Sequence, residues 1–216
     1  MQFQMVLLAI SYKYKKLCVA GIRLDNNNYV RLTHNGDPIE IHEMIVENRL
    51  LKVLDVIQVD ADLLCPNGCQ IENYNLTSNV CYIRTFSLVE LDNLYNQLRH
   101  SSFVYLNNGK FVASNKKDDL SFSLELFKVM NFHTTMVERI DYNNCFSYNK
   151  PYGSFTYNNI KYSELVITDC VCVGHPSNYG NGHEFNFEEG YILVSLPYDK
   201  WAIEHGFYKY IAGIIY

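Results

Sequence analysis

Residues 153–169 read GSFTYNNIKYSELVITD, and this stretch decides the fold class. Runs rich in aromatic and β-branched residues lie on either side of the dipeptide Asn158-Asn159. Asparagine tolerates the positive φ angles that a two-residue turn requires, and such a turn joins neighbouring antiparallel strands. The stretch therefore predicts a β-hairpin in the second half of the chain.

A similar signal occurs in the first half, where residues 17–33 read LCVAGIRLDNNNYVRLT. Two apolar runs are joined by a turn made of aspartate and asparagine, which again indicates a hairpin. In its second arm Tyr29 and Arg31 alternate with Val30 and Leu32. Because side chains alternate along a strand, each pair occupies one face.

Further segments of strand character extend over most of the chain. We expect strands within 3–12, 50–64, 81–86, 121–132, 134–142, 166–173, 190–197 and 207–216. Residues 34–47 are expected to form a loop with a short helix, and 115–119 to be the least structured stretch. Short strands at this spacing favour a sandwich or a barrel over an α/β fold.

One helix is expected near 87–99. Ser87 can act as its N-cap, with Glu90 three residues later completing a capping box. Leucine recurs at helical spacing from Leu88 to Leu98. The sequence thus predicts one or two short helices in an otherwise all-β protein.

Composition supports a globular protein rich in strands. The chain contains 18 Tyr and 12 Phe, residues that suit a pleated and half-buried surface. The net charge of −5 excludes a chain-wide basic field.

No stretch approaches the ~20 apolar residues of a membrane span, and the N-terminus lacks a signal-peptide pattern. Seven scattered cysteines are most simply reduced thiols, so we expect a cytoplasmic protein.

The charge is unevenly distributed. Residues 1–35 carry five basic side chains and one acidic side chain, which leaves a local excess of four positive charges. The excess is consistent with a solvated rim of a barrel and equally with a patch that binds an anionic ligand.

Several segments resemble those of a known family. They are 7–22 (LLAISYKYKKLCVAGI), 26–33 (NNNYVRLT), 63–76 (LLCPNGCQIENYNL), 152–169 (YGSFTYNNIKYSELVITD) and 207–216 (FYKYIAGIIY). In their order and near full-length coverage they resemble bacterial proteins with a dual OB-containing domain. The resemblance implies two OB barrels and no established catalytic activity.

Pattern and resemblance together predict an all-β protein of two successive OB-like β-barrels. We expect the first barrel in 1–110, with the helix near 87–99 bridging it, and the second in 118–216.

OB barrels bind single strands through a basic groove and aromatic side chains on which bases stack. Residues 12–16 read YKYKK and interleave tyrosine with lysine next to the first predicted hairpin. The predicted ligand contacts are Lys13, Tyr14, Lys16, Tyr29 and Arg31, with Asn73 and Tyr74 on an adjacent loop.

Metal binding and catalysis are weaker hypotheses. Cys65 and Cys69 are spaced like zinc ligands, with Cys81 and His42 as possible partners, but a second tight pair is missing. We therefore predict no metal and no cofactor.

The sequence contains no nucleophile elbow, no H-E-x-x-H motif and no P-loop. Asp169 and Glu72 are more typical of turn and loop anchors than of catalytic residues.

The sequence therefore predicts a non-enzymatic protein that binds single-stranded nucleic acid or a nucleotide-like ligand through its first barrel. The alternative is a protein-interaction module, with a protein partner or a second copy of the chain, because tyrosine and arginine favour interfaces. No membrane partner is expected.

Overall fold

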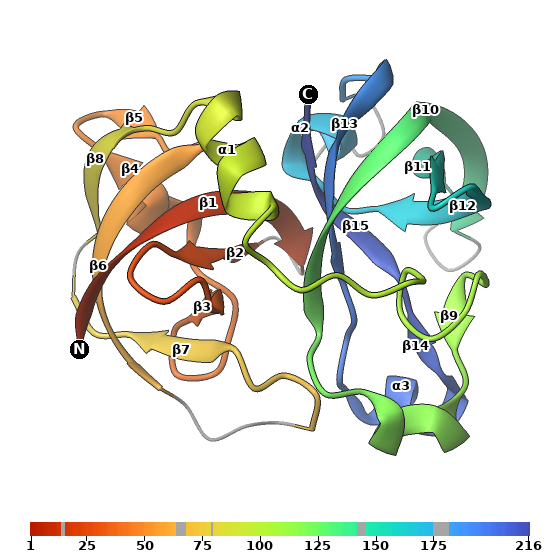
Figure 1. Cartoon of the computed structure of the whole chain (residues 1–216), viewed down its shortest axis with the longest axis horizontal. Helices are drawn as coiled ribbons and strands as arrows, with labels where there is room; N and C mark the ends of the chain where they lie inside the picture. The colour runs from red at the N-terminus through yellow and green to blue at the C-terminus, as the bar shows by residue number, and fades with distance from the viewer. Residues whose placement is uncertain (14–15, 64–67, 79, 142–145, 175–181) are drawn as a thin grey trace.

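The computed structural model describes residues 1–13, 16–63, 68–78, 80–141, 146–174 and 182–216. Figure 1 shows two groups of strands side by side, the first from the N-terminal part of the chain and the second from the C-terminal part. The expected all-β architecture with two OB-like units is confirmed.

The first barrel is a sheet in which five strands form a ring. Its strands are β1 (Gln2–Lys13), β2 (Lys16–Arg23), β3 (Tyr29–Thr33), β6 (Asp55–Leu63), β7 (Asn73–Leu76) and β8 (Cys81–Thr85). They pair in the order β1-β2-β3-β7-β6, and β1 also pairs with β6, which closes the ring. β3 and β7 run parallel, whereas the other neighbours are antiparallel. β8 extends the sheet from β6.

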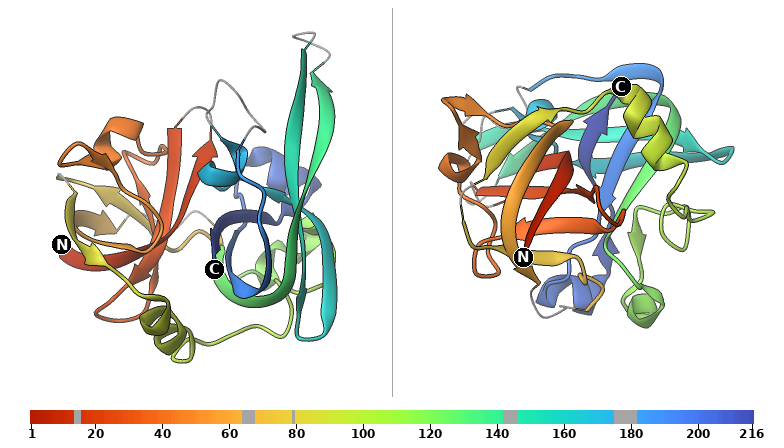
Figure 2. Two further views of the ribbon diagram at one scale, coloured as in Figure 1. Left: turned by 90° about the horizontal axis from the view of Figure 1, so that it is seen from above. Right: turned by 60° about the vertical axis from the view of Figure 1, so that its left-hand side comes forward.

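The second barrel repeats this topology. Its strands are β10 (Leu124–Asp141), β11 (Phe146–Tyr157), β12 (Ile160–Ile167), β13 (Asn186–Ser195) and β15 (Tyr210–Ile215). They close in the order β10-β11-β12-β15-β13, again with the third and fifth strands parallel. The long β10–β11 hairpin projects beyond the rest of the barrel (Figure 2).

Both asparagine turns form as predicted. Asn158 and Asn159 have φ angles of 49° and 61° and connect β11 to β12, while Asn27, with a φ angle of 60°, lies between β2 and β3. The left-handed conformation costs asparagine less than most residues, which explains the turn positions.

The predicted helix is α1 (Leu88–Tyr95), and the Ser87–Glu90 capping box is present. The remaining elements are short. They are η1 (Ile41–Met44), β4 (Ile45–Val46), β5 (Arg49–Leu50), β9 (Phe111–Val112), η2 (Ser114–Asp119), α2 (Cys170–Val173), α3 (Lys200–His205) and β14 (Phe207–Tyr208). Within the described residues, no helix has the length and apolar character needed to cross a bilayer.

Four local predictions were wrong. Asn73 and Tyr74 were expected on a loop, but they lie on β7, which pairs with β3 and β6. The strand expected over 166–173 ends at Ile167, because the Asp169 carboxylate accepts hydrogen bonds from the backbone N–H groups of Val171 and Cys172 and starts α2. The stretch expected to be least structured forms η2. The strands expected within 121–132 and 134–142 form one strand, β10, interrupted by a register shift between Met130 and His133.

Apolar side chains form a core inside each barrel and a third core between the barrels. β1 contributes to two of them, since Met5 and Leu7 enter the first barrel while Val6 and Leu8 face outward. The third core joins Val6 and Leu8 to Leu91 of α1 and to residues of β10, β13 and β15. The helix therefore bridges the barrels, which share one continuous apolar contact (Figure 1).

Candidate functional site

A pocket of about 370 Å³ lies between the two barrels, and we call it the inter-barrel pocket. Each barrel supplies ten lining residues, so neither barrel forms the pocket alone. The first-barrel residues are Ser11, Tyr12, Cys18, Arg31, Leu32, Thr33, Gly36, Pro38, Gln70 and Asn73. The second-barrel residues are Lys150, Val166, Thr168, Ser195, Leu196, Pro197, Asp199, Trp201, Tyr210 and Ala212.

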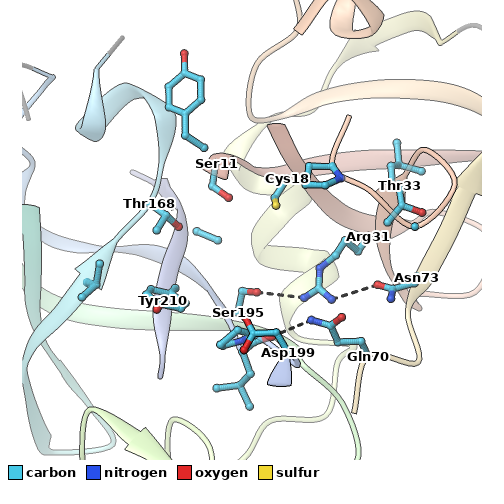
Figure 3. A pocket seen from close by; sticks show the side chains of 18 of the residues that line it. Ser11, Cys18, Arg31, Thr33, Gln70, Asn73, Thr168, Ser195, Asp199 and Tyr210 are labelled. Carbon is cyan, nitrogen blue, oxygen red and sulfur yellow. Dashed lines mark hydrogen bonds between the residues drawn. The ribbon is translucent and has the colours of Figure 1, made fainter. Parts of the chain in front are cut away.

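The position of this pocket follows from the OB topology. OB barrels bind ligands on the face of their second and third strands, between the loops that join strands 1–2 and 4–5. In the first barrel these strands are β2 and β3, which contribute Cys18, Arg31 and Thr33. Gln70 belongs to the segment between the fourth and fifth strands. The second barrel covers this face, and Figure 3 shows Ser195, Thr168 and Tyr210 opposite it.

Arg31 is the central charged group of the pocket, and its side chain joins the two barrels. Its guanidinium donates to Asn73 Oδ1 at 3.2 Å and to Ser195 Oγ at 3.1 Å (Figure 3). It also donates to Ser123 Oγ at 2.8 Å. It also forms an ion pair of 3.4 Å with Glu72 Oε1. Arg31 is only 8% exposed, so most of its hydrogen-bonding capacity is already used inside the protein.

Two predicted contacts, Arg31 and Asn73, therefore meet in the inter-barrel pocket. Gln70 lies close by and donates to the backbone oxygen of Leu196 at 3.2 Å, another bond between the barrels. Side-chain amides and hydroxyls of this kind, next to Tyr12 and Trp201, combine hydrogen bonding with flat apolar surfaces. Such a mixture is typical of small-ligand sites.

The predicted tyrosines lie elsewhere. Tyr29 and Tyr74 line a second pocket of about 370 Å³ together with Glu72 and Glu125. The hydroxyl oxygen of Tyr29 accepts from the backbone N–H of Leu126 at 2.9 Å, and burial raises the pKa of this phenol. Tyr74 is 8% exposed and belongs to the first-barrel core. Neither lines the inter-barrel pocket.

The predicted lysines do not join Arg31 either. Lys16 forms an ion pair with Glu40 at 2.8 Å and lines none of the pockets described here. The backbone of Lys13 pairs with Lys16 at the end of β1. Tyr14 and the side chain of Lys13 lie outside the described residues.

The excess positive charge of residues 1–35 is largely matched by acids. Lys16 pairs with Glu40, Arg23 with Asp25 and Arg31 with Glu72. Glu40 and Glu72 lie outside residues 1–35. The charge counted over that segment alone is therefore more positive than the charge at the folded surface. The three basic side chains of this segment that the structure describes are thus all paired with acids.

The sequence prediction missed the second-barrel half of the pocket. Asp199 caps α3 by accepting from the backbone N–H of Ala202 at 2.8 Å, and Trp201 on that helix is 52% exposed. An exposed tryptophan is unusual enough to attract attention, and Trp201 is the only tryptophan in the chain. The presence of a single tryptophan was the sequence signal that could have pointed to the second-barrel half of the pocket.

Two buried carboxyl groups have raised pKa values, and neither lines the inter-barrel pocket. Burial raises the pKa of Glu125 to about 7, against hydrogen bonds from the Ser101 backbone N–H and hydroxyl that lower it. Burial likewise raises the pKa of Asp169 to about 6, although this group accepts two backbone bonds at the start of α2. Asp169 thus caps neighbouring N–H groups, as its position at a strand end indicated, although these groups belong to a helix that was not predicted.

The part of the chain that the structure describes contains no cluster of side chains suited to bind a metal ion. No group of three or more His, Cys, Asp or Glu side chains is placed there to hold an ion. Cys69 is buried and Cys81 is exposed, whereas Cys65 lies outside the described residues.

Comparison with known proteins adds one finding. The family described as dual OB-containing domain matches residues 3–214, nearly the whole chain. No curated protein and no solved structure matches.

Proposed function

Because the chain belongs to the dual OB-containing domain family, we propose that it is a non-enzymatic binding protein whose inter-barrel pocket holds a nucleotide, free or at the end of a single strand. The observation that carries the proposal is the place of the pocket, on the β2–β3 face of the first barrel and beside the segment leading into β7. OB barrels use this face for oligonucleotides.

The lining suits such a ligand. Asn73 and Gln70 supply amide groups that can pair with a base edge, and Ser11 and Thr168 supply hydroxyls for a sugar or a phosphate. Tyr12 and Trp201 supply rings on which a base can stack. Arg31 orients Asn73 by donating to its oxygen, which leaves the amide N–H groups of Asn73 available to a ligand.

The proposal is tested with Asn73→Asp, which keeps the shape of the side chain and adds a negative charge. The new carboxylate strengthens the pairing with Arg31 but repels a phosphate in the pocket. We expect affinity for a labelled single-stranded oligonucleotide, measured by fluorescence anisotropy at low and moderate salt, to fall by about tenfold. An unlabelled nucleoside monophosphate should displace the oligonucleotide from the wild-type protein.

The matched control is Asn75→Asp, the same change two residues along β7 and outside the pocket. It should change affinity by less than about twofold. Equal effects of the two substitutions, or no binding by the wild type at low salt, would show that the pocket does not hold a nucleotide.

A protein partner is the second candidate, and the β8 edge is the feature that favours it. β8 pairs with β6, and Ile83 on β8 is 42% exposed, with Val89 at the start of α1 73% exposed. An exposed strand edge can accept a strand from another chain. This function predicts no oligonucleotide affinity and a larger species on size exclusion that Ile83→Lys disrupts.

A further inference from the structure

Another hollow, of about 390 Å³, lies on the second barrel, and we call its lining the basic face. It occupies the β11–β12 face, next to the connection between β13 and β15. In the OB scheme this is the position that the inter-barrel pocket has on the first barrel. The repeated strand order thus places a ligand-binding face on each barrel.

The basic face adjoins the inter-barrel pocket. Lys150, Val166, Trp201 and Tyr210 line both of them. A chain-like ligand that leaves the inter-barrel pocket past Trp201 therefore comes directly to the basic face.

The basic face carries cations that remain available to a ligand. Lys110 is paired with Glu164, but Arg139 and Lys150 form no ion pair within the described part of the chain. Lys209 is not available to a ligand, because its side chain is fully buried and its Nζ donates to Asn107 O at 2.8 Å and to Asn107 Oδ1 at 3.0 Å. Burial also lowers the pKa of this amine to about 7. With Lys110 and Glu164 cancelling, two positive charges remain on a protein whose net charge is −5.

Aromatic side chains lie between these cations. Arg139 donates to the hydroxyl of Tyr152 at 2.9 Å, and its guanidinium carbon lies 5.6 Å from the centre of that ring. Lys150 Nζ lies 6.0 Å from the same ring. Trp201 packs against Tyr208 with ring centroids 5.6 Å apart and still exposes half its surface. Cations for phosphates and rings for bases are the two components of single-strand binding.

We infer that a single strand of nucleic acid several nucleotides long continues from the inter-barrel pocket across the basic face, with phosphates at Arg139 and Lys150 and a base on Trp201. This inference rests on the proposed function, since it extends the same ligand beyond the pocket. It assigns the phosphate contacts to the second barrel, where the sequence had suggested the first.

The test compares ligands of different lengths. Trp201 is the only tryptophan, so quenching of intrinsic fluorescence by a stacked base reports on this site alone. We expect a thymidine 12-mer to bind at least about tenfold more tightly than thymidine monophosphate at low salt, because it adds phosphate contacts. Equal affinities for the two ligands would overturn the inference and leave the pocket proposal intact.

The contribution of Arg139 is tested by charge reversal. Arg139→Glu should weaken binding of the 12-mer by about tenfold and reduce the slope of log affinity against log salt by about 0.7, the value for one phosphate on a single strand. Binding of the monophosphate should not change, because Arg139 does not line the inter-barrel pocket. Arg139→Gln, which removes the charge and keeps a donor for Tyr152, should have an intermediate effect.

The matched control is Lys117→Glu, which reverses an exposed charge on η2 outside both hollows. If Arg139→Glu weakens the 12-mer no more than Lys117→Glu does, the basic face does not bind the strand. If the protein binds poly-glutamate of similar length as tightly as the thymidine 12-mer, the ligand is not specifically a nucleic acid and the inference is overturned. Binding of the 12-mer that depends on Arg139 without any binding of the monophosphate would overturn the pocket proposal and leave the basic face intact.

Discussion

Single residues at the contact between the barrels are in unusual electrostatic surroundings. Arg31 and Glu72 are both less than 10% exposed, and Arg31 donates to serine hydroxyls of the second barrel. Removing one partner of a buried ion pair leaves the other charge unpaired, which costs more than the pair contributes. For this reason Arg31→Glu, which would be the obvious test of a phosphate contact, would chiefly report on the joint between the barrels.

Glu125 gives a prediction that depends on pH. Its pKa is raised to about 7 in the folded protein, so between pH 4.5 and 7 the folded state binds more protons than the unfolded state. The free energy of unfolding of the wild type should therefore fall as pH rises through that window. Glu125→Gln keeps the bond from the Ser101 backbone N–H, reverses the hydroxyl bond so that Nε2 donates to Ser101 Oγ, and has no charge to desolvate. The free energy of unfolding of the variant minus that of the wild type should therefore be larger at pH 8 than at pH 5, by up to about 3 kcal/mol.

Urea denaturation of both proteins at the two pH values measures this difference. A stability difference between Glu125→Gln and wild type that is the same at pH 5 and pH 8 would show that the carboxyl is not desolvated in the folded state.

At the scale of elements, the asparagine turns and the helix cap were predictable because they depend on neighbouring residues. The Asn158-Asn159 turn needs only two residues that tolerate positive φ, and the Ser87–Glu90 cap needs only a spacing of three. α3 was not predicted, because six residues carry too weak a periodic signal. The end of the strand at Ile167 was misjudged because apolar runs in a short helix and in a strand look alike.

The turn supplies the element-scale prediction. Asn159 has a φ angle of 61°, and a β-branched side chain there clashes with the backbone. Asn159→Val should lower the free energy of unfolding by about 1–2 kcal/mol. Asn159→Gly, which adopts this conformation freely, should change it by less than about 0.5 kcal/mol. Chemical denaturation of the two variants should separate them, and equal stabilities would argue against a left-handed residue at this position.

At the scale of the whole molecule, the two barrels form one unit because β1 and β15 approach closely. A Cβ atom on Gly213 of β15 would lie 1.9 Å from the backbone oxygen of Leu8 on β1. Only glycine permits this close approach. The approach lets the apolar side chains of the third core pack between the barrels and brings the two halves of the inter-barrel pocket together.

Gly213→Ala should therefore separate the barrels. We expect a loss of about 1–3 kcal/mol in stability, as for an overpacked core, and weaker nucleotide binding. Calorimetry and small-angle scattering should detect a lower melting temperature and a larger radius of gyration. The control is Gly109→Ala, whose added Cβ would lie 3.2 Å from the end of the Asn107 side chain and 3.7 Å from the backbone oxygen of Phe111, an ordinary contact. If both variants melt at the same temperature, the close approach does not hold the barrels together.

The sequence by itself determined the strands, the turns and the helix cap, because alternation of side chains and local φ preferences act between near neighbours. Only the tertiary structure decided the site. Arg31 and Ser195 are 164 residues apart and share a hydrogen bond, and Arg31 is neutralised by Glu72. Charge and exposure depend on which distant residues fold against a side chain. Among the described residues, Lys16, Arg23 and Arg31 of the N-terminal segment are paired with acids, while Arg139 and Lys150 form no ion pair.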